Sequence, residues 1–147
     1  MLRNKRFGLI LLTVAFIGGF VFGNLLQTQE IVSAQSDRVF ELRTYTTNDG
    51  KLPNLLTRFR DHTTRIFEKH GMTNVGYWVP EDAKDHPAST LIYVISHDSR
   101  DAATENWQAF RDDPEWKQVA EESQRDGRIV ANVESVFMKA TDFSRLH

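Results

Sequence analysis

The order in which the hydrophobic period changes along this chain constrains its fold more than any other feature. Apolar residues recur every second position in some segments, which is typical of strands, and every three to four positions in others, which is typical of helices. The strand-like segments are 38–46, 73–79, 90–97 and 128–140, and the helix-like segments are 53–70, 97–113 and 114–127. This β-α-β-β-α-β order predicts an α+β fold of the ferredoxin-like kind.

The stretch FRDDPEW, residues 110–116, divides the second helical region. Asp113 is a favourable N-cap, and Pro114 is favourable as the first residue of a helix. We therefore expect two helical segments, anchored on either side by Phe110 and Trp116. The residues expected in the core between sheet and helices are Phe40, Leu42, Phe59, Ile66, Trp107, Phe110 and Trp116.

The N-terminus has the composition of an export signal. A basic segment, MLRNKRF, is followed by an uncharged apolar run, and this order is typical of signal peptides. Val32 and Ala34 fit a cleavage site before Gln35, so residues 1–34 are expected to be removed and the rest to be periplasmic or extracellular. The apolar run is close to the length that spans a bilayer, and an uncleaved membrane anchor formed by residues 7–26 is the alternative.

Residues 35–37 are expected to be a linker, and residues 38–145 to be one domain with a single core. From residue 35 onward the chain has fifteen basic and nineteen acidic residues, a net charge of −4, and no cysteine. A mildly acidic domain without a basic stripe is a poor nucleic-acid binder. The lack of cysteine excludes thiol catalysis and thiolate metal sites. Contact with a membrane is expected only through the N-terminal segment, if that segment is not cleaved.

Two expected strands are apolar on both faces. In residues 90–97, Tyr93 alternates with Ile92 and Val94, and in residues 128–140 the pattern is similar. Two helices can cover only one face of the sheet, and no other segment remains to cover the second. The sequence therefore predicts a homodimer in which the outer faces of two sheets meet.

Several motifs together resemble those of the NIPSNAP family, in the form found in exported bacterial proteins. They are FELRTYTTNDGKLPNLLTRFRDHT, EKHGMTNVGYWVP, TLIYVISHDSR, WQAFRDDPEWKQVAEES and VESVFMKATDFS, which extend from Val39 to about Ser144. The resemblance implies ferredoxin-like protomers that join as a dimeric α+β barrel. It implies no catalytic residues, because the family has no settled catalytic motif.

The first strand carries the leading site candidates. Glu41, Arg43 and Tyr45 share one face, which in a dimeric barrel is expected to be the inner one. An arginine beside a glutamate in a cavity can bind a carboxylate or polarise a carbonyl group. The more favoured alternative is a structural ion pair between Glu41 and Arg43, or with Glu134.

Three further residues are candidates for the wall of a cavity. Tyr77 and Trp78 are adjacent in a strand and face opposite ways, and we expect Tyr77 in the core and Trp78 at the cavity. Tyr93 is the second candidate, and His97, at the end of its strand, is the third and the leading acid-base group. The histidine spacings match no metal motif, so neither a metal nor a cofactor is expected.

Two classes of function remain. The first is a dimeric module of the cell envelope that binds a small molecule or a protein and catalyses nothing. The second is a cofactor-independent monooxygenase-like or haem-related enzyme that uses the barrel cavity, by analogy with similar folds. The sequence favours the binding module.

Overall fold

The computed structural model describes residues 37–146, which belong to one compact unit, Asp37–His147. The export segment expected at residues 1–34 and most of the linker lie outside the described residues. The elements are β1 (Val39–Thr47), α2 (Leu52–Arg58), a π-helical turn (Phe59–Thr63), α3 (Thr64–Lys69), β2 (Thr73–Trp78), a 3-10 turn (Ala83–Asp85), β3 (Thr90–His97), α4 (Arg100–Asp112), α5 (Pro114–Glu122) and β4 (Val130–Met138).

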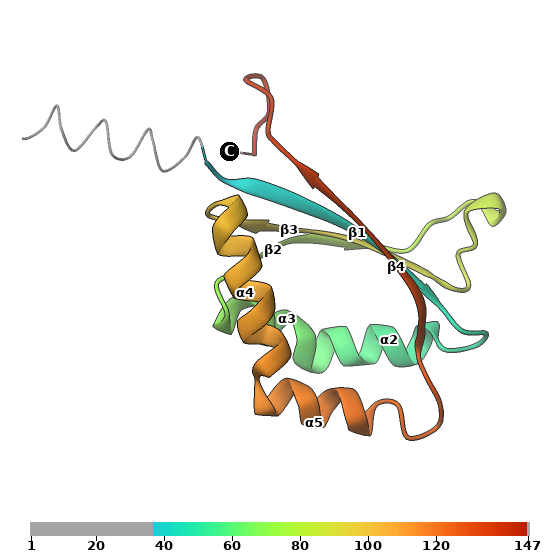
Figure 1. The fold of residues 1–147 in the computed structure, drawn as a ribbon. Coiled ribbons are helices and arrows are strands. Elements are labelled where there is room, and N and C mark those ends of the chain that lie inside the picture. Colours follow the sequence, from blue (N-terminus) through green and yellow to red (C-terminus); the bar gives the residue numbers. More distant parts are fainter. Residues whose placement is uncertain (1–36, 147) are drawn as a thin grey trace, which may run out of the picture. The chain divides into compact units, whose positions relative to one another are not determined.

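The four strands form one antiparallel sheet in the order β2-β3-β1-β4, and the helices lie on one face of it (Figure 1). This is the predicted α+β, ferredoxin-like βαββαβ arrangement. In the register of the two central strands, Arg43 pairs with Tyr93 and Leu42 pairs with Val94. Because directly paired residues of a sheet share a face, this register fixes which side chains turn toward the helices.

Local sequence signals explain where the helices begin and end. The Ser99 hydroxyl accepts a hydrogen bond from the Ala102 amide at 3.0 Å and caps α4. The Asp113 carboxylate accepts from the Glu115 amide at 2.7 Å and caps α5, whose first residue is Pro114. The prediction for FRDDPEW is therefore confirmed.

The helical region after β1 contains a turn that the sequence pattern did not predict. Residues Phe59–Thr63 are π-helical, so the chain bulges between α2 and α3. The Thr63 hydroxyl donates to the Arg58 carbonyl oxygen at 3.2 Å across this bulge. The Thr63 side chain thus adds a hydrogen bond across the wider turn.

The core between sheet and helices agrees with the prediction in part. Phe59, Ile66 and Phe110 are buried, and Trp107 and Trp116 pack against them half-buried. Phe40 and Leu42, however, lie on the opposite face of the sheet, so their assignment to this core is wrong. Aromatic residues from β1, β2 and β3 fill the space instead, namely Tyr45, Tyr77 and Tyr93.

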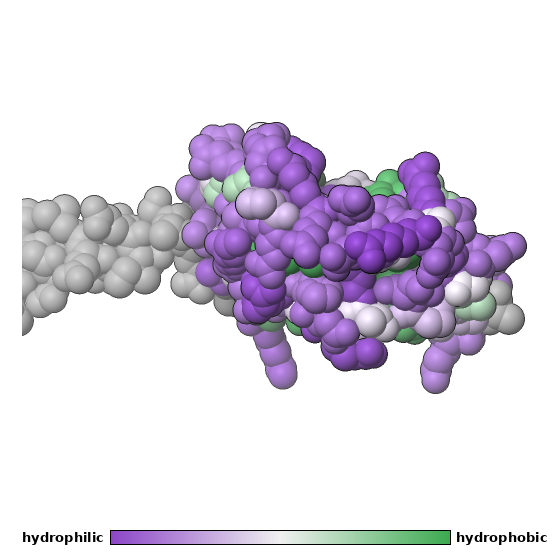
Figure 2. All heavy atoms as spheres, turned by 90° about the horizontal axis from the view of Figure 1, so that it is seen from below, coloured by the Kyte–Doolittle hydropathy of each residue, from purple (hydrophilic) through white to green (hydrophobic). Residues whose placement is uncertain are grey.

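The two sides of the domain differ in polarity. Seen from the helix side, the surface is mostly hydrophilic (Figure 2). On the sheet face that the helices leave open, Trp78, Val136 and Met138 are exposed. Within residues 37–146, every helix is too short or too polar to cross a bilayer.

Candidate functional site

The three polar candidates on β1 face the helices and not the open side of the sheet. Tyr45 packs edge-on against Phe59, and the Arg43 guanidinium lies over the Trp107 ring, 4.3 Å from its centroid. Glu41 reaches the Trp107 indole of α4. The expectation that these side chains line the space between two facing sheets is therefore wrong, because the register turns them toward their own helices.

The Glu41 carboxylate is the centre of a buried polar cluster. It is 1% exposed. One oxygen accepts hydrogen bonds from Arg43 Nη1 and Ser135 Oγ, both at 2.6 Å. The other accepts from Trp107 Nε1 at 2.6 Å and lies 3.2 Å from His97 Nε2. The predicted Glu41–Arg43 ion pair is present, and three further side chains from β3, α4 and β4 converge on the same carboxylate.

This cluster holds Glu41 in its charged form. Burial by itself raises the pKa of the carboxyl, but the hydrogen bonds from His97, Ser135 and Trp107 and the charge of Arg43 outweigh burial and lower it to about 2. A carboxylate this weakly basic is a poor general base near neutral pH. Its role is to fix the positions of Arg43 and Trp107.

His97 is brought to the cluster but is enclosed. Its side chain is fully buried, with Nε2 toward Glu41 and Nδ1 3.3 Å from the Asn106 side-chain amide. Asn106 in turn donates to the Gly71 carbonyl oxygen at 3.0 Å. Both ring nitrogens therefore face protein groups, and this geometry suits a positioning residue.

A pocket of about 330 Å³ opens beside this cluster, between α4 and the edge strand β4. Glu41 and Ser135 form part of its floor, together with Arg43 and Phe137. The wall is one stripe of α4, Arg100, Ala103, Thr104, Trp107 and Arg111. The helix layer leaves the side chains of β4 largely exposed, and this opens the groove.

The pocket is electropositive. Arg100 lies over the Phe137 ring, 3.4 Å from its centroid, and Arg111 donates to the Gln108 side chain at 2.9 Å. Among the described residues, neither arginine forms an ion pair with a carboxylate. The negative charge of Glu41 neutralises only that of Arg43. The positive charges of Arg100 and Arg111 therefore remain to attract an anion.

Sequence analysis missed most of this wall. Arg100, Thr104, Trp107 and Arg111 recur at intervals of three and four residues, which places them on one helix face. That spacing is a signal from which the shared face of these residues can be predicted. Ser135 and Phe137 could not be assigned without the register of β4 against β1.

Tyr93 is inside the core and not at a cavity wall. It is fully buried, stacks on Tyr77 with ring centroids 5.4 Å apart, and meets Tyr45 edge-on at 5.3 Å. Burial raises the pKa of Tyr93 well above its usual value. The phenol therefore stays neutral at physiological pH.

Trp78 lies on the other face of the sheet, away from the Glu41 cluster. Its side chain is 53% exposed and pairs across the sheet with Ile92. A methyl group added at Gly76 would come within 2.5 Å of the Trp78 ring, so the ring lies directly over this glycine. Tyr77, its neighbour, is in the core as predicted, while Trp78 is separate from the other candidates.

Family membership follows from the sequence that builds this scaffold. The NIPSNAP family model matches residues 40–145, which include all the helices and strands described above except the first residue of β1, Val39. The chain belongs to the NIPSNAP family. This NIPSNAP domain contains both the Glu41 cluster and the arginine-lined pocket.

Solved NIPSNAP structures have the same fold. A NIPSNAP family protein of unknown function from Agrobacterium tumefaciens is 26% identical, with a TM-score of 0.65 over 76% of this chain and 96% of that one. A second from the same organism is 23% identical, with a TM-score of 0.64 over 75% and 99%. A NIPSNAP domain protein from Burkholderia xenovorans is 20% identical, with a TM-score of 0.60 over 72% and 97%. Among curated proteins, no sequence matches this chain significantly.

Proposed function

We propose that this NIPSNAP-domain protein is a binding module for a small organic anion, held between α4 and β4. The observation that carries the proposal is the pair Arg100 and Arg111, which face one pocket without a carboxylate partner among the described residues. Arginine binds carboxylates through two parallel hydrogen bonds. Trp107, Phe137 and Ala103 supply apolar contact for the rest of a ligand.

The geometry of the cluster favours binding over catalysis. An acid-base enzyme would need a group with a pKa near the working pH within reach of the ligand. Glu41 lies beside the pocket but its pKa is about 2. His97, the other acid-base candidate, has both ring nitrogens turned to protein groups. The monooxygenase-like or haem-related alternative has no comparable support.

We further propose that the protein acts as a homodimer of the cell envelope. Support for the dimer comes from the open sheet face, where Trp78, Val136 and Met138 are exposed beside the half-buried Ile92 and Val94. Large exposed apolar patches are usually interfaces. Support for export comes from the basic and then apolar N-terminal sequence and from Val32 and Ala34, which fit a cleavage site before Gln35.

The anion site can be tested by calorimetric titration of the purified protein with acetate, succinate and benzoate. Each carboxylate is compared with its neutral amide. We expect at least one carboxylate to bind and its amide not to bind. Arg100→Ala and Arg111→Ala should each weaken binding about tenfold or more, the typical effect of losing a charged hydrogen bond.

Arg128→Ala is the matched control, because Arg128 is exposed and does not line this pocket. It should bind the carboxylates as the natural chain does. Equal affinity for acid and amide, or full binding by both pocket variants, would contradict the proposal.

A further inference from the structure

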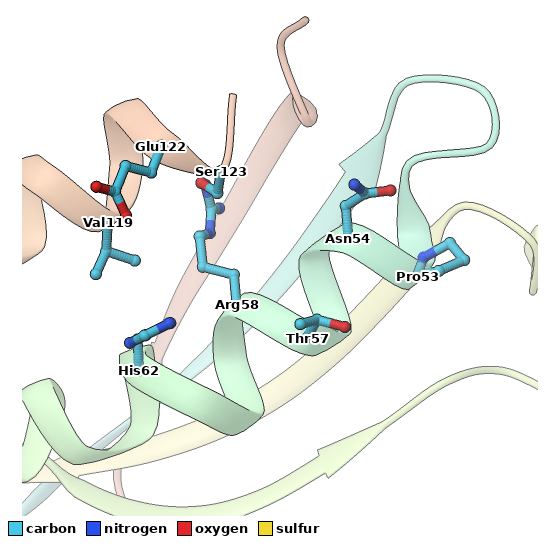
Figure 3. Close-up of a pocket in the computed structure, with 8 residues that line it drawn as sticks. All are labelled: Pro53, Asn54, Thr57, Arg58, His62, Val119, Glu122 and Ser123. Carbon is cyan, nitrogen blue, oxygen red and sulfur yellow. The ribbon is translucent and has the colours of Figure 1, made fainter. Parts of the chain in front are cut away.

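A second cation lies between α2 and α5, away from the pocket of Arg100 and Arg111. Arg58, the last residue of α2, is 7% exposed, and its side chain extends toward α5 (Figure 3). Its Nη1 donates to the Ser123 hydroxyl at 3.3 Å, and its guanidinium carbon lies 5.3 Å from the Trp116 ring centroid. The guanidinium is therefore fixed from two sides before any ligand arrives.

Within the described part of the chain, Arg58 is buried without a counter-charge. None of the ion pairs among residues 37–146 includes it, and its Nε atom is buried without a hydrogen-bond partner there. Arg43, by contrast, has Glu41 as its partner. A buried charge that lacks a partner is costly, so an anion beside Arg58 would stabilise this part of the fold.

The guanidinium borders a pocket of about 450 Å³. Figure 3 shows that the side chains lining this pocket come from the α2 side and from the α5 side. Pro53, Asn54, Thr57, Arg58 and His62 come from α2 and the π-helical turn, and Val119, Glu122 and Ser123 come from α5 and its end. π-helical turns occur frequently at functional sites, and this one carries His62 at the pocket edge.

The acidic residue in the wall does not neutralise Arg58. The Glu122 carboxylate accepts a hydrogen bond from the Gln118 side chain at 3.0 Å and lies 3.8 Å from the Arg125 guanidinium. Figure 3 shows it turned toward the Val119 side of the pocket. The positive charge of Arg58 therefore remains available.

We propose that this pocket is a second ligand site, which binds a small carboxylate through Arg58. A single guanidinium matches the single charge of a carboxylate better than the larger charge of a phosphate. Asn54, Thr57 and His62 can hydrogen-bond a hydroxyl group on the ligand, while Pro53 and Val119 contact its carbon atoms. The ligand class is therefore a small hydroxy acid in its anionic form.

The indole N–H signal of Trp116 is the direct reporter, because this ring lies against Arg58. In nuclear magnetic resonance titrations of the purified protein, lactate should shift this signal saturably, whereas neutral lactamide should not. Inorganic phosphate should shift it less than lactate does. Trp107 marks the other pocket, so its response distinguishes this proposal from the one for Arg100 and Arg111.

Arg58→Met should weaken the lactate response about tenfold or more, while Arg60→Ala, an exposed arginine on the same helical region, should leave it unchanged. If Arg58→Met does not fold, Ser123→Ala removes one contact of the guanidinium and should still weaken binding. The proposal is overturned by an unmoved Trp116 signal in the folded natural chain, by an equal response to lactamide or phosphate, or by undiminished binding in the folded Arg58 or Ser123 variants.

Discussion

Glu41 is a buried carboxylate whose charge is held by hydrogen-bond donors from three other elements. Its pairing with Arg43 could be predicted, because the two residues are two apart on one strand and so share a face. Which face they occupy could not be predicted. The apolar Phe40 and Leu42 alternate with them, and apolar residues usually face the helices, but here a ring of aromatic residues around Tyr45 and Tyr93 fills that layer.

At the residue scale, we expect acid sensitivity from Glu41. Its pKa is lowered from the ordinary 4.5 to about 2, so its stabilising contribution is complete above pH 4.5 and is lost as the pH falls toward 2. The shift corresponds to about 3 kcal/mol of unfolding free energy. Glu41→Gln should remove most of this contribution, which urea unfolding from pH 7 to pH 2 can measure.

Asp113 also has a lowered pKa, chiefly because Lys69 and His70 hydrogen-bond to it. The natural chain therefore loses stability in acid because both Glu41 and Asp113 become protonated. The difference in unfolding free energy between the natural chain and Glu41→Gln isolates the contribution of Glu41. A constant stability difference between the two chains over this pH range would contradict the account of Glu41.

At the element scale, the break between α4 and α5 joins three helices. Asp113 caps α5, and its other oxygen binds Lys69 Nζ at 2.7 Å and His70 Nε2 at 2.5 Å from the end of α3. The cap and the proline at 114 could be read from the sequence, because capping depends on neighbouring residues. The contacts with Lys69 and His70 depend on how distant helices pack, and the sequence carried no signal for them.

We expect Asp113→Ala to lower the unfolding free energy by about 2 kcal/mol, because it removes both the cap and the contacts with α3. Asp113→Asn preserves a side chain that can cap, and should cost about half as much. Urea unfolding near neutral pH measures both. Equal losses in the two variants would mean that the cap contributes little and that the charge alone matters.

At the scale of the whole molecule, helices cover one face of the sheet and, within residues 37–146, leave the other face open. The order of strands and helices along the chain was predictable, because each segment shows its own hydrophobic period. The faces were not, because β3 is apolar on both sides and its alternation favours neither. The pocket between α4 and β4 was also beyond prediction, since it arises where the helices fall short of the edge strand.

If the open face is the dimer interface, we expect Val136→Asp to convert dimers to monomers or aggregates. Val136 is 55% exposed and pairs with Leu42 on this face, so the change should disturb the interface without unfolding the protomer. Val133→Asp is the control, because Val133 lies on the same strand, is 39% exposed and pairs with Tyr45 on the helix-facing side. Light scattering at micromolar concentrations reports the oligomeric state of each variant. Identical behaviour of the two variants, or a monomeric natural chain, would count against this interface.

Binding of an organic anion between α4 and β4 can be measured with the three tryptophans as reporters. Trp107 lines this pocket, Trp116 lies beside Arg58, and Trp78 is on the open face. Their indole N–H signals can be followed by nuclear magnetic resonance during a titration with benzoate and with benzamide. We expect a saturable shift of the Trp107 signal with benzoate alone, and none at Trp78. A shift at Trp78 with Trp107 unmoved, or equal shifts with benzamide, would rule out an anion site between α4 and β4.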